Sequence, residues 1–141
     1  MTEDDVKQIV ELGAVFWESV PYKVDYHPET TEVLIKWMDD NHYLHILKKE
    51  DTIVAMLGVL VHPMMYNADV LQATEIFFFV APEERQNGLG EALLEMAEKD
   101  LKDMGCEFFV MSEMPSTSMD LAEWYTKLGY RTGERQWIKE L

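Results

Sequence analysis

Six residues between an apolar run and a helical pattern carry the clearest chemical signal in the chain. They read Arg-Gln-Asn-Gly-Leu-Gly and occupy positions 85–90. Gly88 and Gly90 tolerate positive φ and let a ligand approach the backbone. The first N–H groups of the helix that follows have no partner inside that helix, so they attract an anion together with the helix dipole. Arg85 adds a charge-assisted contact. The stretch therefore predicts a seat for a phosphate or pyrophosphate.

Two familiar phosphate motifs do not fit this stretch. It lacks the Gly-x-x-x-x-Gly-Lys-Ser/Thr pattern of a P-loop and the Gly-x-Gly-x-x-Gly fingerprint of dinucleotide-binding domains. A Gly-x-Gly sequence at the start of a helix also occurs where a chain only makes a tight turn. Taken alone, the motif leaves two interpretations open, a ligand-binding turn and a plain one.

Charge and composition narrow the function classes. The 141 residues suffice for one domain with a real core, and 48% of them are hydrophobic. With 12 basic and 27 acidic residues the net charge is −15, which repels nucleic acid and anionic lipid. The same charge would attract a cationic substrate, although acidity also simply keeps a protein in solution. The four histidines show no metal-ligand spacing, and we expect no metal site.

Nothing in the sequence indicates export or membrane insertion. The single cysteine, Cys106, excludes an intrachain disulfide and fits a reducing compartment. The N-terminus lacks a signal-peptide pattern, and the longest apolar run, residues 53–61, is too short to span a bilayer. We therefore expect a cytoplasmic protein that binds neither membrane nor nucleic acid.

The apolar periodicity predicts an α/β domain that changes from helix to strand and then alternates between the two. The predicted elements are, in order, helices over residues 3–20 and 28–41, a β-hairpin over 43–63, a loop over 64–70, a central strand over 71–81, a helix over 87–105, a strand over 106–113, a short helix over 118–129 and a final strand over 134–141. The strand–helix–strand unit from Leu71 to Met111 predicts a crossover between parallel neighbours, and the hairpin makes the sheet mixed. We predict a single domain, residues 1–141, with a mixed central sheet flanked by helices.

Each long helix also has a predicted inner face, because its apolar residues recur at helical spacing. These residues are Val6, Ile9, Val10, Gly13, Phe16 and Trp17 in the first helix, Val33, Leu34 and Trp37 in the second, and Leu89, Ala92, Leu93, Met96, Ala97 and Leu101 in the third.

A second stretch, residues 121–131, raises the significance of the glycine turn. Residues 85–90 resemble the Arg/Gln-x-x-Gly-x-Gly/Ala motif of the GCN5-related N-acetyltransferases (GNAT). Residues 122–130, Ala-Glu-Trp-Tyr-Thr-Lys-Leu-Gly-Tyr, resemble the later helix of that family, which reads aromatic-Tyr-x-x-x-Gly-Phe/Tyr. The predicted order of elements matches the family over nearly the whole chain. Residues 73–88 look most like the small acetyltransferases of phages and bacteria.

The resemblance implies the acyl-CoA N-acyltransferase fold, acetyl-coenzyme A as donor and a primary amine, on a small molecule or a protein, as acceptor. It implies that the coenzyme is bound along one part of the chain, within residues 78–90, and at two later positions. The implied coenzyme-binding residues are Phe78, Phe79, Val80, Arg85, Gln86, Asn87, Gly88, Leu89, Gly90, Ser118 and Tyr125. Backbone N–H groups near Phe79 and Val80 would polarise the thioester carbonyl.

Glu75 is the candidate base for such a transfer. A lysine-type amine has a pKa of about 10.4, so holding it neutral at pH 7 costs roughly 4–5 kcal/mol unless a base helps. Glu75 is a lone acid inside an apolar strand, where burial would raise its pKa into a useful range. The alternative is that Glu75 points to the solvated face or forms a structural ion pair.

Tyr125 is the candidate acid, since the resemblance places it where the family has its general acid. A phenol can donate a proton to the sulfur of the leaving thiolate. The alternative is packing, with Trp124, Tyr125 and Leu128 forming the buried side of a short helix.

The sequence departs from the family pattern at several positions. The first strand is reduced or missing, which opens one edge of the sheet unless the partner in a homodimer covers it. Glu91 follows the glycine turn where a basic residue is common, and Ser118 stands where many members have Asn. The leading hypothesis is an acetyl-coenzyme A-dependent N-acetyltransferase. The alternative is a non-catalytic module on the same fold that binds acyl-coenzyme A or another protein.

Overall fold

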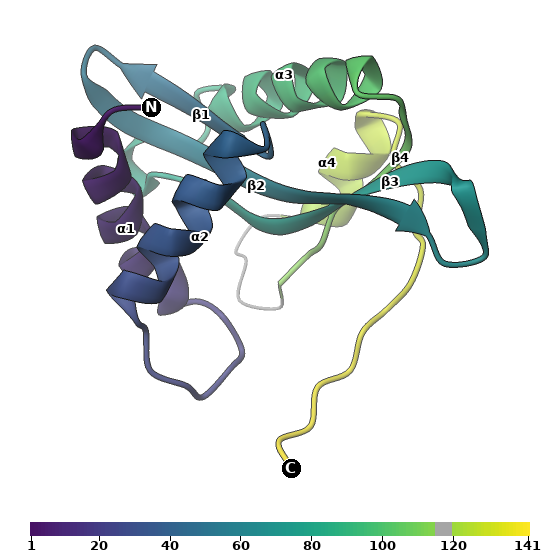
Figure 1. The fold of residues 1–141 in the computed structure, drawn as a ribbon, viewed down its shortest axis with the longest axis horizontal. Coiled ribbons are helices and arrows are strands. Elements are labelled where there is room, and N and C mark those ends of the chain that lie inside the picture. The colour runs from purple at the N-terminus through teal and green to yellow at the C-terminus, as the bar shows by residue number, and fades with distance from the viewer. Residues whose placement is uncertain (115–119) are drawn as a thin grey trace.

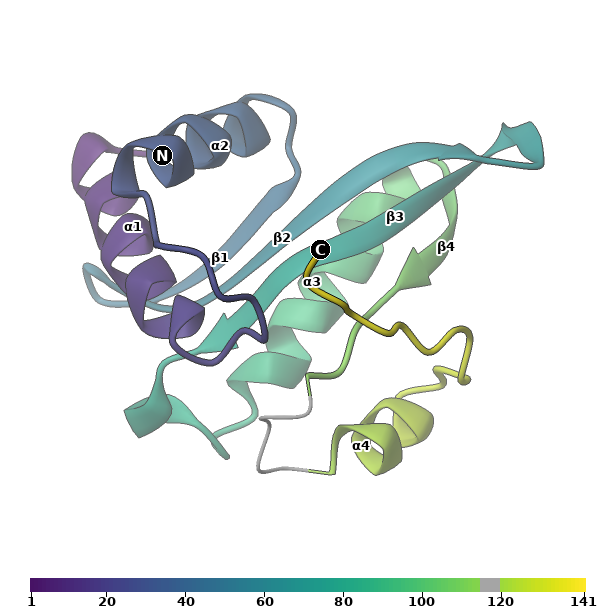
Figure 2. The same cartoon turned by 90° about the horizontal axis from the view of Figure 1, so that it is seen from below.

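The computed structural model describes residues 1–114 and 120–141, which form helices on both faces of one four-stranded sheet (Figures 1 and 2). The elements are α1 (Glu3–Trp17), α2 (Pro28–Asp40), β1 (Leu44–Lys49), β2 (Thr52–Met64), β3 (Asn67–Val80), the 3₁₀ turn η1 (Pro82–Glu84), α3 (Leu89–Asp103), β4 (Cys106–Val110) and α4 (Leu121–Lys127). The sheet order is β1-β2-β3-β4, with antiparallel pairs except for the parallel pair β3–β4. The predicted hairpin, parallel crossover and mixed α/β sheet are confirmed.

Two apolar clusters lie on opposite faces of the sheet. On one face α3 packs its buried residues Leu93, Leu94, Ala97 and Leu101 against β2 and β3, with α4 beside it. On the other face α1 and α2 bury Ile9, Ile35 and Met38 against the aromatic end of β3. The two residues before α1 form no strand, in line with the predicted reduced or missing first strand, and among the described residues β1 lies at one edge of the sheet.

The predicted inner face of α2 is wrong by about one residue. Val33 is 71% exposed and Trp37 43%, whereas Ile35 and Met38 are buried. Successive residues of a helix lie about 100° apart, so a small rotation replaces one stripe by the next. Trp37 packs at the rim instead, edge-on to Tyr43. In α3 the inner stripe is nearly as predicted, but Leu94 is buried and Ala92 is exposed.

Two strand predictions also need correction. The loop expected over residues 64–70 is only a two-residue turn at Met65 and Tyr66, because β2 and β3 continue as a long hairpin. The strand expected over residues 134–141 does not form, and the segment extends away from the body (Figure 1). Strand formation depends on pairing with a neighbour, and none of the strands in residues 1–114 and 120–141 pairs with this segment.

A β-bulge in β3 changes which residues face α3. Gly58 of β2 pairs with Phe77 and Val59 pairs with Glu75, so Ile76 is an extra residue. Alternation before the bulge puts Glu75 on the same face as Ala73, toward α3. After the bulge Phe77 faces α1 and α2, and the face toward α3 passes to Phe78. The bulge therefore places Glu75 and Phe78 on one face although they are three residues apart.

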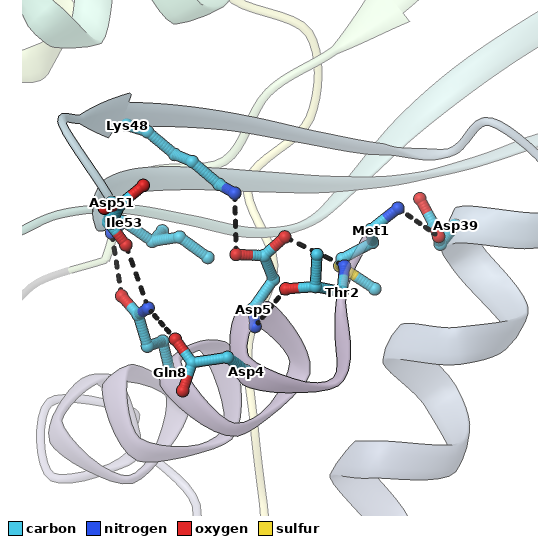
Figure 3. A network of polar contacts seen from close by, with 9 residues as sticks. All are labelled: Met1, Thr2, Asp4, Asp5, Gln8, Asp39, Lys48, Asp51 and Ile53. Carbon is cyan, nitrogen blue, oxygen red and sulfur yellow. Dashed lines mark hydrogen bonds and ion pairs between the residues drawn. The ribbon is translucent and has the colours of Figure 1, made fainter.

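A polar network fixes the N-terminal end of α1 to the sheet (Figure 3). The carboxylate of Asp5 is buried, accepts a hydrogen bond from the Thr2 N–H at 2.9 Å and pairs with Lys48 Nζ at 2.7 Å. Gln8 ties the same helix to the β1–β2 turn through Asp51 O and Ile53 N. The hydrogen bond from Lys48 and the bond from Thr2 hold the pKa of Asp5 at about 2.

We expect Asp5→Asn to lower the melting temperature by several degrees at pH 7, because the ion pair with Lys48 is lost. The folded pKa of Asp5 is depressed from 3.8 to about 2. Its contribution to stability is therefore full above pH 3.8 and disappears as the pH falls through 2. Thermal melts of both proteins from pH 7 to pH 2 should show the difference closing in that window. Glu11→Gln, on the exposed side of the same helix, is the control and should change little.

Candidate functional site

The site begins where β3 and β4 separate. Their pairing runs from Leu71–Cys106 to Thr74–Val110, and β3 then continues for six residues without a partner in β4. Glu75 is the first residue beyond the last pair. The edge of β3 that faces β4 therefore carries backbone N–H and C=O groups outside the ladder from Glu75 to Val80.

Glu75 is half-buried in this opening, and its Oε2 accepts a hydrogen bond from the Ser112 N–H at 2.7 Å. Burial raises the pKa of Glu75 to about 7, while the Ser112 N–H opposes the rise. A carboxyl with this pKa exists in both protonation states near neutral pH, as a proton acceptor requires. The orientation and pKa agree with the predicted base, whose role remains a prediction.

Tyr125 reaches the same point from α4. Its hydroxyl donates to the Ser112 carbonyl at 3.1 Å. The helix that positions it is capped by Asp120, whose Oδ1 accepts a hydrogen bond from the Glu123 N–H at 3.1 Å. Burial, reinforced by the negative charges of Glu75 and Glu113, raises the pKa of Tyr125 far above its usual range. The phenol therefore keeps its proton at neutral pH and is available as a donor.

Ser112 joins the two candidates, and it was not identified from the sequence. Its N–H binds Glu75 and its C=O binds Tyr125, so the backbone of one residue positions both side chains. Nearly every residue type has the same backbone N–H and C=O groups, so the identity of a residue does not indicate this role. The only available signal is position, since Ser112 lies two residues beyond the end of β4.

The predicted anion seat lies at the end of β3. The chain turns through η1, and Gln86 and Gly88 adopt left-handed conformations with φ of 68° and 77°. Gly88 is the N-cap of α3, so no side chain caps the helix. A Cβ at Gly88 would meet no atom within 4 Å, so the space beside this backbone is open. An uncapped helix start beside open space is the geometry that an anion needs.

Arg85 has a partner within the chain. Its Nε donates to the Val80 carbonyl at 2.9 Å, and its guanidinium lies 5.4 Å from the centre of the Phe79 ring. In this position Arg85 fixes the end of β3 against the turn. Its predicted contact with a coenzyme phosphate remains a prediction, as do those of Gln86, Asn87 and Leu89.

An aromatic stack closes the space between β3, α3 and α4. The rings of Phe78 and Trp124 are parallel within 7°, with centroids 6.2 Å apart. Gly90 lies directly against this pair, because a Cβ there would be 3.3 Å from Phe78 Cζ and 3.6 Å from Trp124 Cη2. The second glycine of the motif is thus favoured by close packing, and the first by its positive φ.

We expect Gly90→Leu to destabilise the protein by about 1–3 kcal/mol, because the added side chain must displace the Phe78–Trp124 stack. Urea unfolding followed by tryptophan fluorescence measures the change in free energy. Gly133→Leu is the control, because a Cβ at Gly133 meets nothing within 4 Å. Equal stability of the two variants would show that the packing at Gly90 is not restrictive.

Three further sequence predictions concern Ser118, a metal site and membrane insertion. Ser118 lies outside the described residues. Within residues 1–114 and 120–141, no three His, Cys, Asp or Glu side chains are arranged to hold a metal ion. In the same ranges no helix is long and apolar enough to cross a bilayer.

Comparison with known families gives a match over most of the chain. The model of the acetyltransferase (GNAT) family matches residues 11–130, which include both motifs, Glu75 and the turn before α3. A comparison with curated proteins gave no significant match.

Solved structures share the fold at low sequence identity. A transcriptional regulator from Bacillus halodurans C-125 is 18% identical with a TM-score of 0.77, and the match covers 100% of this chain and 96% of that one. An acetyltransferase from Trypanosoma brucei is 21% identical with a TM-score of 0.73 and the same coverage. The enzyme AAC(6')-Iy, in complex with the bisubstrate analogue CoA-S-monomethyl-acetylneamine, is 15% identical with a TM-score of 0.74, covering 100% of this chain and 94% of that one.

Proposed function

Because the chain belongs to the GNAT family of acetyltransferases, we propose that it moves an acetyl group from acetyl-coenzyme A to a primary amine, with both substrates bound at once. One observation carries the proposal. Glu75 and Tyr125 come from different elements and meet at the backbone of Ser112, at the point where β3 and β4 separate. A half-buried acid with a raised pKa and a protonated phenol are the two groups that acyl transfer to an amine needs.

The donor site in this proposal follows the end of β3 into α3. The N–H groups of residues 86–90 would hold the pyrophosphate, and the open space beside Gly88 leaves room for it. The unpaired edge of β3 would accept the pantetheine arm near Phe78, and N–H groups near Phe79 and Val80 would polarise the carbonyl. When bound, acetyl-coenzyme A supplies the activated thioester. Glu91 in the first turn of α3 opposes an anion there and should weaken binding.

Glu75 and Tyr125 divide the proton transfers between them. The amine nitrogen forms a bond to the acetyl carbon as the carbon–sulfur bond breaks. Glu75 takes the proton that the amine loses, and its pKa of about 7 suits this task near neutral pH. Tyr125 donates a proton to the departing sulfur and regains one from Glu75, which restores both groups.

The acceptor in this proposal is cationic in its resting form. A net charge of −15 favours the approach of an ammonium ion and disfavours nucleic acid. The half-buried carboxylate of Glu75 then gives the ammonium group a partner inside the opening, and the ammonium releases one proton to solvent before its nitrogen attacks. Small polyamines, aminoglycoside-like molecules and basic peptides all satisfy this description.

Single-turnover transfer from radiolabelled acetyl-coenzyme A to a panel of amines tests the proposal. We expect a stable acetylamide on at least one acceptor, formed faster than the coenzyme hydrolyses without acceptor. Coenzyme binding without transfer to any amine would overturn the catalytic proposal and favour the alternative, a non-catalytic module that retains the ligand.

A further inference from the structure

Lys49 and Glu84 form an ion pair that joins the end of β1 to the turn before α3. Lys49 Nζ lies 2.8 Å from Glu84 Oε1, although the two residues are 35 positions apart in the sequence. Glu84 is the last residue of η1, so its side chain belongs to the turn that leads into the predicted anion seat. The hydrogen bond from Lys49 lowers the pKa of Glu84, and the same bond raises the pKa of Lys49, so both groups are charged at neutral pH. The proposed acetyl transfer uses neither side chain.

The anion seat is a part of the chain whose shape needs support. Gln86 has a φ of 68°, a left-handed conformation that a residue with a side chain keeps only where its surroundings hold it. Residues 85–88 are all exposed, and no side chain caps α3. N–H groups that must be ordered when a ligand arrives bind it more weakly, because the ordering costs conformational entropy. A contact that fixes this turn in advance therefore increases its affinity for a phosphate.

The carboxylate of Glu84 connects the two sides of this turn. Its Oε1 accepts the hydrogen bond from Lys49, and its Oε2 accepts a longer one from Asn87 Nδ2 at 3.5 Å. Asn87 directly precedes Gly88, the N-cap of α3. The side chain of Glu84 is only 16% exposed, so the carboxylate is held against the protein and not free in solvent. One acid thus links the end of β1 to the residue before the helix.

Lys49 itself comes from a part of the sheet that α1 holds in place. Side chains alternate along a strand, so the neighbouring lysines of β1 point in opposite directions. Lys48 pairs with Asp5 of α1 at 2.7 Å, whereas Lys49 pairs with Glu84 of η1. Gln8 of α1 also binds the β1–β2 turn that follows Lys49, as Figure 3 shows. The ion pair therefore ties the exposed turn to a fixed point.

Charge gives the ion pair a second effect on the anion seat. Residues 82–91 hold three acids, Glu83, Glu84 and Glu91, and one base, Arg85, which leaves a side-chain charge of −2. This charge repels a pyrophosphate group. Lys49 brings the local charge to −1, because its ammonium group neutralises Glu84 at contact distance. Without Lys49 the turn would lose a support and Glu84 would stand uncompensated beside the bound anion.

We propose that the Lys49–Glu84 pair holds the turn before α3 in its anion-binding shape, which makes Lys49 a positioning residue for the coenzyme. The inference rests on the proposed function, since it requires acetyl-coenzyme A at this turn. Lys49 acts through the carboxylate of Glu84 and does not touch the coenzyme. Its effect on binding therefore depends on Glu84, and a double-mutant cycle isolates that dependence.

Calorimetric titration of acetyl-coenzyme A into wild type, Lys49→Met, Glu84→Ala and the double variant tests the inference. Lys49→Met should raise the dissociation constant about 3–10-fold, because support and charge compensation are lost together. In the Glu84→Ala background Lys49 has no carboxylate to hold, and the same substitution should change the constant less than about two-fold. An equal loss in both backgrounds would mean that Lys49 contacts the coenzyme directly and would overturn the proposal.

Lys36→Met is the matched control for the loss of one positive charge. Lys36 forms an exposed pair with Glu32 at 2.7 Å on α2, and its replacement should leave coenzyme binding unchanged. Lys49→Arg keeps the ion pair and should bind like wild type. The melting temperature of Lys49→Met should match that of wild type, because an exposed ion pair adds little to global stability. A lowered melting temperature in step with weaker binding, or no rescue by Arg, overturns the positioning role.

The same titrations distinguish a failure of this inference from a failure of the proposed function. A wild type that binds no acetyl-coenzyme A overturns the donor site and, with it, the role of Lys49. A wild type that binds the coenzyme no better than Lys49→Met keeps the donor site and overturns the role of Lys49 alone.

Discussion

Replacing Glu75 by Gln is expected to lower kcat/KM for acetyl transfer by about 10²–10⁴-fold, the usual contribution of a positioned general base. Gln can still accept the Ser112 N–H through its amide oxygen, so the loop after β4 keeps its position. The wild-type pH–rate profile should rise through pH 7, following the raised pKa of Glu75, and the variant should lose that limb. Steady-state kinetics from pH 5 to pH 9 measure both effects.

The same substitution should stabilise the protein at alkaline pH. The carboxyl ionises near pH 4.5 in the unfolded chain and near pH 7 in the folded one, so the folded state holds its proton longer. Ionisation of Glu75 therefore reduces stability as the pH rises from 4.5 through 7. Above pH 7 Glu75→Gln removes a penalty of about 3 kcal/mol, and below pH 4.5 the two proteins should converge.

Glu107→Gln is the matched control, since Glu107 is an exposed acid of β4. It should change neither the rate nor the stability appreciably. If Glu75→Gln proved as active as wild type, Glu75 would not be the base. If it were inactive and less stable at pH 8, the carboxylate would have a structural role.

Replacing Tyr125 by Phe is expected to lower kcat by about 10²-fold or more with a smaller change in KM, because the proton for the leaving sulfur is lost. The phenol also donates to the Ser112 carbonyl, so a loss of about 0.5–1.5 kcal/mol in stability should accompany the change. Rapid-quench kinetics separate the acetyl transfer step from product release.

Tyr130→Phe provides the control for Tyr125. Tyr130 lies beside Tyr125, with ring centroids 5.4 Å apart, and its hydroxyl is bonded to Glu98 instead of Ser112. Loss of that hydroxyl should cost stability but little activity. Equal losses of rate in the two variants would mean that the aromatic cluster acts only by packing.

Sequence patterns were sufficient for the elements whose structure depends on local interactions. Thr2 and the acids after it form a capping box at the start of α1, and Gly105 follows the end of α3 with a φ of 91°. The glycine turn was found because glycine suits both of its positions, for two different reasons. Gly88 needs its backbone angle, and Gly90 needs the absence of a side chain.

Features that depend on pairing were not predictable in the same way. The bulge at Ile76 lies in an unbroken apolar run, and only the register between β2 and β3 reveals it. The bulge sets which of the later residues of β3 share a face with Glu75. The alternation of residues in β3 alone therefore could not predict whether Glu75 points toward α3. The segment 134–141 has the composition of a strand, but a strand forms only where a partner edge is available.

Calorimetric titration of acetyl-coenzyme A tests the central claim, that the turn before α3 seats the coenzyme of an acetyltransferase. Wild type should give a saturable isotherm with one site per chain, and Gly88→Trp should abolish it by filling the open space beside the turn. Gly105→Trp is the control, because Gly105 also has positive φ and open space but lies beyond the other end of α3, and it should bind like wild type. No binding to wild type, or unchanged binding to Gly88→Trp, would contradict the account.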